Sequence, residues 1–158
     1  MNYLEKSILQ KHNNVELLIE YNVFFEKSNS FCCFALDDNE ELNELKSILE
    51  KIKSIDNTAN IYCCTYGVNN NDAIYIYSDD IWIDTILSIN ELKALFMKYD
   101  TIHNPLRGVV PNDILGLSEE ELQKNNIEYI VSSSGDIKNY NEIKTVLNGK
   151  SIKRMLWD

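Results

Sequence analysis

The sequence predicts a single α+β domain over residues 1–158, with a mainly antiparallel sheet of about five to six strands and helices packed against it. Three observations lead to this fold class. Apolar segments joined by short turns form a meander in the middle of the chain. Capping sequences precede apolar residues at helical spacing. A chain of 158 residues with 44% apolar content can form a core without a metal or a disulfide.

The N-terminal part is expected to hold one short helix and two strands. Apolar residues at helical spacing predict a helix over residues 3–10. Apolar and polar residues alternate over residues 15–25, which predicts a half-buried strand with a bend near Asn22. After a polar turn, residues 31–36 return as an apolar strand.

The clearest predicted helix begins at Asp38. This residue is a favourable N-cap, and Glu41 three residues later completes a capping box. The acidic first turn suits the positive end of the helix dipole. We expect the helix to end near residues 56–57. Its buried side is predicted from the spacing of its apolar residues: Leu42, Leu45, Ile48, Leu49, Ile52 and Ile55.

The middle of the chain predicts three strands followed by a helix. The strands are expected at residues 61–66, 73–77 and 81–84, which are rich in Ile, Tyr, Cys and Trp. Residues 78–80, Ser-Asp-Asp, are interpreted as a turn between the last two strands. Ser88 then caps a helix, with Glu91 in capping-box position. The buried side of this helix is expected to contain Leu92, Leu95, Phe96 and Tyr99.

Prolines and glycines predict an irregular loop over residues 100–116. Ser118 and Glu121 form a third capping box, which opens a short helix. The remaining expected elements are a strand at residues 127–132 and helices at residues 141–147 and 152–157.

The formal net charge of −10 is the most informative feature of the composition. So negative a surface repels the phosphates of nucleic acids and anionic lipids. It favours rapid capture of a basic partner, although charge also serves solubility. The N-terminal residues have no signal-peptide pattern, and no apolar run reaches about 18 residues. We therefore expect a cytoplasmic protein with reduced cysteines.

Side chains that could carry chemistry are few. Cys32-Cys33 and Cys63-Cys64 fall in predicted strands, where neighbouring thiols point to opposite faces, so buried apolar cysteines are favoured over a zinc site. His12 and His103 lie in polar or irregular segments. Asp79, Asp80 and Asp84 could hold magnesium, but the sequence has no glycine-rich phosphate-binding loop to accompany them. The sequence predicts no catalytic residue, metal ligand or cofactor.

Charge is distributed unevenly along the chain. Between Ser54 and Leu92 there are six acidic residues and no Lys or Arg. This pattern is expected of a protein that docks against a basic surface. Aromatic side chains in acidic surroundings suit an interface, although they also pack beneath helices. The predicted partner-binding residues are Asp79, Asp80, Asp84, Glu40, Glu44, Tyr75, Tyr77 and Trp82.

Residues 80–92, DIWIDTILSINEL, with Pro-Asn-Asp-Ile at residues 111–114, resemble a strand–turn–helix element of small bacterial immunity proteins. Such proteins accompany polymorphic toxins, including those of contact-dependent growth inhibition. The resemblance implies a cytoplasmic protein that binds one cognate toxin domain, often a nuclease, and blocks its active site or an essential surface. It transfers no individual binding residue.

Two other function classes remain open from the sequence. One is a small cytoplasmic enzyme, a hydrolase or transferase that uses scattered Asp, His and Cys residues. Perturbed pKa values around a cleft would favour it. The other is a regulatory protein-interaction module, which an exposed aromatic patch and self-association would favour.

Overall fold

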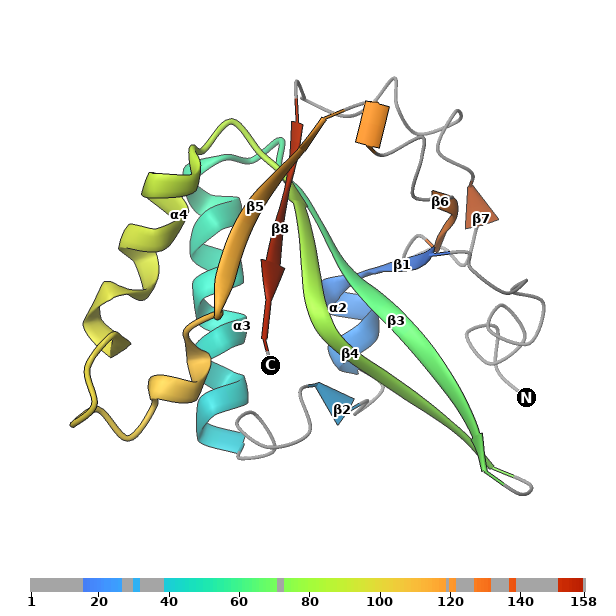
Figure 1. Ribbon diagram of the computed structural model, residues 1–158, viewed down its shortest axis with the longest axis horizontal. Coiled ribbons are helices and arrows are strands. Elements are labelled where there is room, and N and C mark those ends of the chain that lie inside the picture. Colours follow the sequence, from blue (N-terminus) through green and yellow to red (C-terminus); the bar gives the residue numbers. More distant parts are fainter. Residues whose placement is uncertain are drawn as a thin grey trace.

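The computed structural model describes residues 16–26, 30–31, 39–70, 73–118, 120–121, 127–131, 137–138 and 151–157. At its centre is one sheet with the strand order β5-β8-β4-β3-β1-β6-β7, and β2 pairs with β4 (Figure 1). The strands are β1 (Glu16–Glu20), β2 (Ser30–Phe31), β3 (Asn60–Asn70), β4 (Ala73–Asp84), β5 (Asp113–Ser118), β6 (Ile127–Val131), β7 (Ile137–Lys138) and β8 (Ser151–Leu156). Among the described strands, the β1–β6 and β2–β4 pairs are parallel and the other pairs antiparallel.

Helices pack on one face of this sheet. They are α2 (Tyr21–Glu26), α3 (Asn39–Ile55), α4 (Ile89–Phe96) and the 3₁₀ turns η1 (Met97–Tyr99) and η2 (Arg107–Val109). Their apolar side chains share one core with alternate residues of the strands, including Ile81 and Ile83 of β4. Figure 1 shows α3 and α4 side by side near β5 and β8. The prediction of an α+β fold with a mainly antiparallel sheet is confirmed.

The two best-marked helices follow their sequence patterns. In α3, Leu45, Ile48, Leu49 and Ile52 are buried as predicted. Ile55 is 52% exposed instead, because α3 ends there and no further turn continues its apolar face. The cap predicted for α4 is confirmed, since the Glu91 N–H donates to Ser88 Oγ at 3.1 Å. Of its predicted apolar side, Leu92, Phe96 and Tyr99 are buried and Leu95 is partly buried.

The strand predicted over residues 15–25 is wrong in its second half. β1 ends at Glu20, and α2 follows directly. Val23, Phe24 and Phe25 are consecutive and all buried, whereas a strand would send Phe24 to the face opposite its neighbours. The helix lets the Phe24 ring pack edge-on against Phe25, with 5.2 Å between ring centroids.

The three-strand meander is a hairpin of two long strands, β3 and β4. The predicted turn at residues 78–80 is wrong, because β4 runs through it without interruption. The irregularity lies on β3 instead, as a bulge between Cys63 and Thr65. The Ser78 hydroxyl donates to the Cys64 carbonyl at 2.7 Å. A residue type common in turns therefore supplies a hydrogen bond to the backbone at the bulge.

Near the C-terminus, a strand replaces a predicted helix. Residues 152–157 were expected to be helical, but β8 lies between β4 and β5 and pairs with both. Ladder bonds on two sides outweigh a weak helical spacing. The loop predicted over residues 100–116 gives way to β5 at Asp113. The strand at β6 and the cap at Ser118, which accepts from the Glu121 N–H at 3.2 Å, are confirmed.

The predicted elements at residues 3–10, 32–36 and 141–147, and the predicted cap Asp38, lie outside the described residues. Within the described part of the chain, no helix is long and apolar enough to cross a membrane.

A buried carboxylate joins the end of α3 to the segment between β4 and α4. Asp56 is 3% exposed. Its Oδ1 accepts from the N–H and the hydroxyl of Thr58 at 3.1 and 2.6 Å. Its Oδ2 accepts from the Thr85 hydroxyl at 2.6 Å and the Ile86 N–H at 3.0 Å. Burial raises the pKa of Asp56, but these hydrogen bonds outweigh it and lower the pKa to about 2.

We expect Asp56→Ala to lower the free energy of unfolding by roughly 2–3 kcal/mol at neutral pH, because it leaves several donors without their charged acceptor. Urea unfolding measures this loss, with the exposed neighbour substitution Asn57→Ala as the control. Since the folded pKa is depressed, the stabilisation is present above the unfolded pKa of 3.8 and is lost as the pH falls towards about 2. The difference between Asp56→Ala and the unmodified protein should shrink over that range; a constant difference would contradict this assignment.

Candidate functional site

Three of the predicted partner-binding residues lie together on the sheet face opposite the helices. Asp80, Trp82 and Asp84 alternate along β4 with the core residues Ile81 and Ile83. Their exposed fractions are 0%, 1% and 0%. They do not form the exposed acidic patch that the sequence predicted, because the segment is a central strand rather than a surface turn.

Asp80 is held by a basic residue that the sequence analysis did not single out. Its Oδ2 accepts from Arg154 of β8, at 2.7 Å from Nη2 and 2.9 Å from Nε. The guanidinium also lies over the Trp82 ring, 5.3 Å from its centroid. Burial raises the pKa of Asp80, and the hydrogen bonds and charge of Arg154 counteract this only in part.

The Trp82 indole also lowers the pKa of Asp80. In the described structure, Asp80 Oδ1 and Trp82 Nε1 have no hydrogen-bond partner. An incompletely satisfied buried carboxylate depends strongly on its one cation.

A row of polar and aromatic residues crosses the same face. Glu20, Tyr62, Trp82 and Arg154 stand opposite one another on β1, β3, β4 and β8. Burial, with the negative charges of Glu20 and Asp84, raises the pKa of Tyr62 to about 12. The Asn60 amide donates to Asp84 Oδ2 at 3.1 Å. The face therefore gathers titratable groups that lie far apart in the sequence.

The other predicted site residues lie elsewhere. Tyr77 and Asp79 of β4 are partly exposed, and the Tyr77 hydroxyl donates to Asp79 Oδ2 at 3.2 Å. Tyr75 lies in the same strand, and its side chain is outside the described set. Glu40 is exposed at the start of α3. Glu44 is partly exposed, accepts a hydrogen bond from the Tyr99 hydroxyl, and lies 4.0 Å from the Lys98 ammonium.

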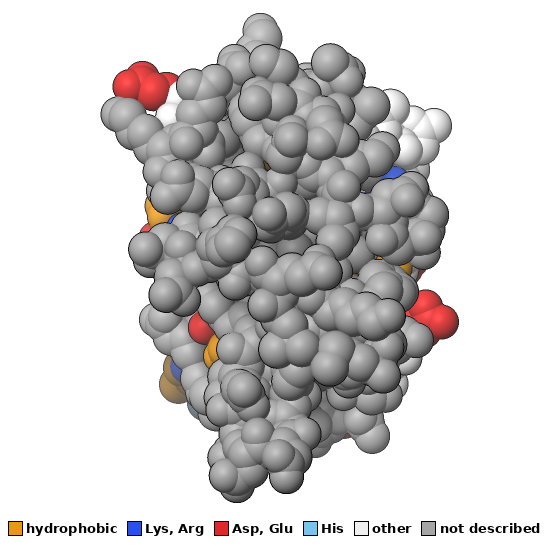
Figure 2. Space-filling view, turned by 90° about the vertical axis from the view of Figure 1, so that its right-hand side faces the viewer, with side chains coloured by type: hydrophobic (Ala, Val, Ile, Leu, Met, Phe, Trp, Pro, Cys, Tyr) orange, Lys and Arg blue, Asp and Glu red, His pale blue; other side chains and the backbone are white. Residues whose placement is uncertain are grey.

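The described acidic side chains do not gather into one continuous surface on the side shown in Figure 2. The Asp and Glu atoms visible there lie at separate places on the molecule. On α3, acidic Glu40 and Glu44 are followed by basic Lys46 and Lys51. On the side shown in Figure 2, the described negative charge is therefore scattered.

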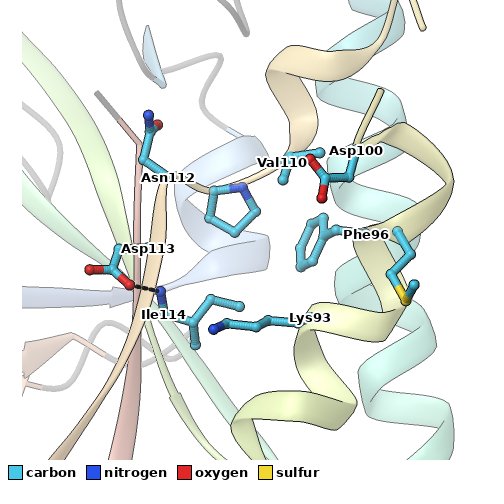
Figure 3. Close-up of a pocket in the computed structure, with 9 residues that line it drawn as sticks. Lys93, Phe96, Asp100, Val110, Asn112, Asp113 and Ile114 are labelled. Carbon is cyan, nitrogen blue, oxygen red and sulfur yellow. Dashed lines mark hydrogen bonds between the residues drawn. The ribbon is translucent and has the colours of Figure 1, made fainter. Parts of the chain in front are cut away.

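A cleft between α4 and the start of β5 is the other candidate site (Figure 3). Its volume is about 320 Å³, within the range of small-ligand pockets. One wall consists of Lys93 and Phe96 of α4, Met97 of η1, and Asp100 directly after η1. The facing wall consists of Val110, Pro111, Asn112, Asp113 and Ile114.

The cleft has an apolar interior and charged ends. Phe96 and Ile114 are buried at its base, whereas Met97 is 69% exposed. Figure 3 shows Phe96 between Asp100 and Lys93, and Lys93 extends towards the β5 wall. Asp113 Oδ1 accepts from the Ile114 N–H at 2.9 Å, and its carboxylate points away from α4. The helical spacing of the first wall was visible in the sequence, but its pairing with residues 110–114 was not.

Nucleophilic chemistry has little support among the described cysteines and histidine. Cys63 and Cys64 are buried, as predicted, and neither takes part in a disulfide. Burial, aided by the charge of Asp80, raises the pKa of the Cys63 thiol well above its usual value, the opposite of an activated thiolate. His103 is exposed in the loop before η2. In the part of the chain that is described, no His, Cys, Asp or Glu groups could hold a metal. Cys32, Cys33 and His12 lie outside it.

A scan against protein-family models found no match, and searches of curated proteins and of solved structures found none either.

Proposed function

We propose that this protein is an immunity protein that binds a cognate bacterial toxin domain, a basic nuclease, in the cytoplasm and neutralises it. The observation that carries the proposal is the net charge of −10 on a chain with a cleft open to a partner. A nuclease needs a basic surface to hold its phosphate substrate, and an acidic protein can occupy that surface. The action is binding, and no catalytic residue, metal or other cofactor is assigned.

An exposed apolar side chain supports a docking role for the cleft. Met97 lines the cleft and is 69% exposed. Apolar and methionine side chains within polar surroundings are typical of the central part of protein interfaces.

The proposal predicts that a neighbouring gene encodes the cognate toxin domain, and this domain is used for the test. Purified protein and domain should form a stoichiometric complex that lacks nuclease activity. Association should be steered by charge, with a rate constant on the order of 10⁷–10⁹ M⁻¹s⁻¹ at low salt that falls steeply as salt is added. Absence of a complex at micromolar concentrations, or a complex with full nuclease activity, would refute the function.

A second candidate function is a small hydrolase or transferase. It is favoured by the sheet face on which Asp80, Asp84 and Arg154 converge with Tyr62, whose pKa is raised. Asp84→Asn separates the two functions. A binding protein that keeps its fold should still neutralise the toxin after this substitution, whereas an enzyme that relies on this face should lose its activity.

A further inference from the structure

The cleft between α4 and β5 has opposite charges at the two ends of its helical wall. Lys93 lies in α4, and Asp100 directly follows η1. Both side chains are exposed to solvent. A group that fills the cleft lengthwise would therefore meet a cation at one end and an anion at the other.

Between these ends the wall is apolar. Phe96 lies between Lys93 and Asp100 (Figure 3), and Met97, which is exposed, also lines the cleft. Pro111 and Ile114 face them across the cleft. This surface suits a hydrocarbon chain rather than a second polar group, since no hydrogen bond is needed to satisfy it.

We propose that the cleft receives one arginine residue of the basic partner. The guanidinium pairs with the Asp100 carboxylate, the methylene stem packs on Met97 and Phe96, and the main-chain carbonyl of the arginine accepts from the Lys93 ammonium. This inference rests on the proposed function, because it names the group through which the partner docks.

The chemistry of the cleft favours arginine over other occupants. An arginine side chain combines an apolar methylene stem with a terminal cation, and the lining of the cleft offers an apolar surface for the first and the Asp100 carboxylate for the second. Its planar cation donates two parallel hydrogen bonds to one carboxylate, which a lysine ammonium cannot do. An acidic side chain could pair with Lys93, but it would meet Asp100 and the field of a chain with net charge −10. Arginine is also enriched among the residues that dominate binding energy at interfaces.

The test uses N-acetyl-arginine amide as the probe and follows backbone amide signals of the whole protein by NMR. We expect shifts concentrated at residues 93–100 and 110–114, with saturation on titration. Asp100→Asn should weaken probe binding roughly tenfold, because it removes a charge-assisted pair. The matched control is Glu91→Gln, which makes the same change of charge on an exposed residue of α4 that does not line the cleft. It should bind the probe as the unmodified protein does.

Shifts spread over the molecule, or equal weakening by Asp100→Asn and Glu91→Gln, would overturn the inference and indicate general attraction to an acidic surface. N-acetyl-glutamate amide serves as the negative probe, and stronger shifts with it than with the arginine probe would also overturn the inference. These results do not depend on the toxin. Failure of the protein to bind the toxin domain would therefore refute the proposed function separately. Toxin binding without localised shifts from the arginine probe would refute only the arginine site in the cleft.

Discussion

Replacing Arg154 with methionine should lower the free energy of unfolding by about 3–5 kcal/mol at neutral pH. The substitution keeps an apolar stem on Trp82 but removes the only cation paired with Asp80 in the described structure. Asp80 is fully buried, and its Oδ1 already has no hydrogen-bond partner. The loss therefore comes mainly from an unpaired buried carboxylate rather than from lost packing.

The pH dependence identifies this cause. Burial raises the pKa of Asp80 in the folded protein, so its ionisation costs folding free energy as the pH rises. Without Arg154 that pKa rises further, because the opposing charge is gone. Urea unfolding of Arg154→Met should show a loss of stability that grows as the pH rises above 3.8, the ordinary pKa of an aspartate.

Two comparisons make the Arg154 prediction specific. Asp80→Asn combined with Arg154→Met should recover part of the lost stability, since no charge then remains buried. Arg107→Met changes an exposed arginine in η2 and should alter stability by less than about 0.5 kcal/mol. If the double variant is no more stable than Arg154→Met, the unpaired carboxylate is not the cause.

Charge reversal in the cleft should have the largest effect on toxin binding. With Asp100→Arg, a cation of the protein would face the arginine of the partner where a carboxylate now stands. Like charges placed together at an interface cost several kcal/mol, so the affinity should fall by roughly 100-fold or more. Calorimetry with the toxin domain measures the change.

The comparison for Asp100→Arg is Glu91→Arg, which makes the same change of two charge units on the same helix outside the cleft. It should slow association at low salt but leave most of the affinity at physiological salt. Equal losses in the two variants would mean that overall charge, and not the cleft, determines binding.

The sequence predicted the elements whose signals are local. Ser88 and Glu91 mark the start of α4, and the spacing from Leu45 to Ile52 gives the buried side of α3. These signals depend on hydrogen bonds and periodicity within one segment. β8 was misinterpreted because its pairing with β4 and β5 joins parts of the chain far apart in sequence.

The candidate sites were harder to predict for a related reason. Ser78, Asp79 and Asp80 have turn-forming side chains, but a bulge in β3 and a guanidinium from β8 make them part of a strand. Buried and exposed aspartates look alike in a sequence, and the basic partner of Asp80 is 74 residues away. The cleft was missed because only tertiary packing brings residues 110–114 against the face of α4.

The most direct measurement is growth of cells that express the neighbouring toxin domain with and without this protein. Neutralisation by a bound partner predicts that the unmodified protein restores growth, that Glu91→Arg also restores it, and that Asp100→Arg does not. The toxin domain should remain present at full length in the rescued cells, because binding leaves it intact. Continued growth arrest with abundant folded protein would contradict the account, as would rescue accompanied by chemical destruction of the toxin.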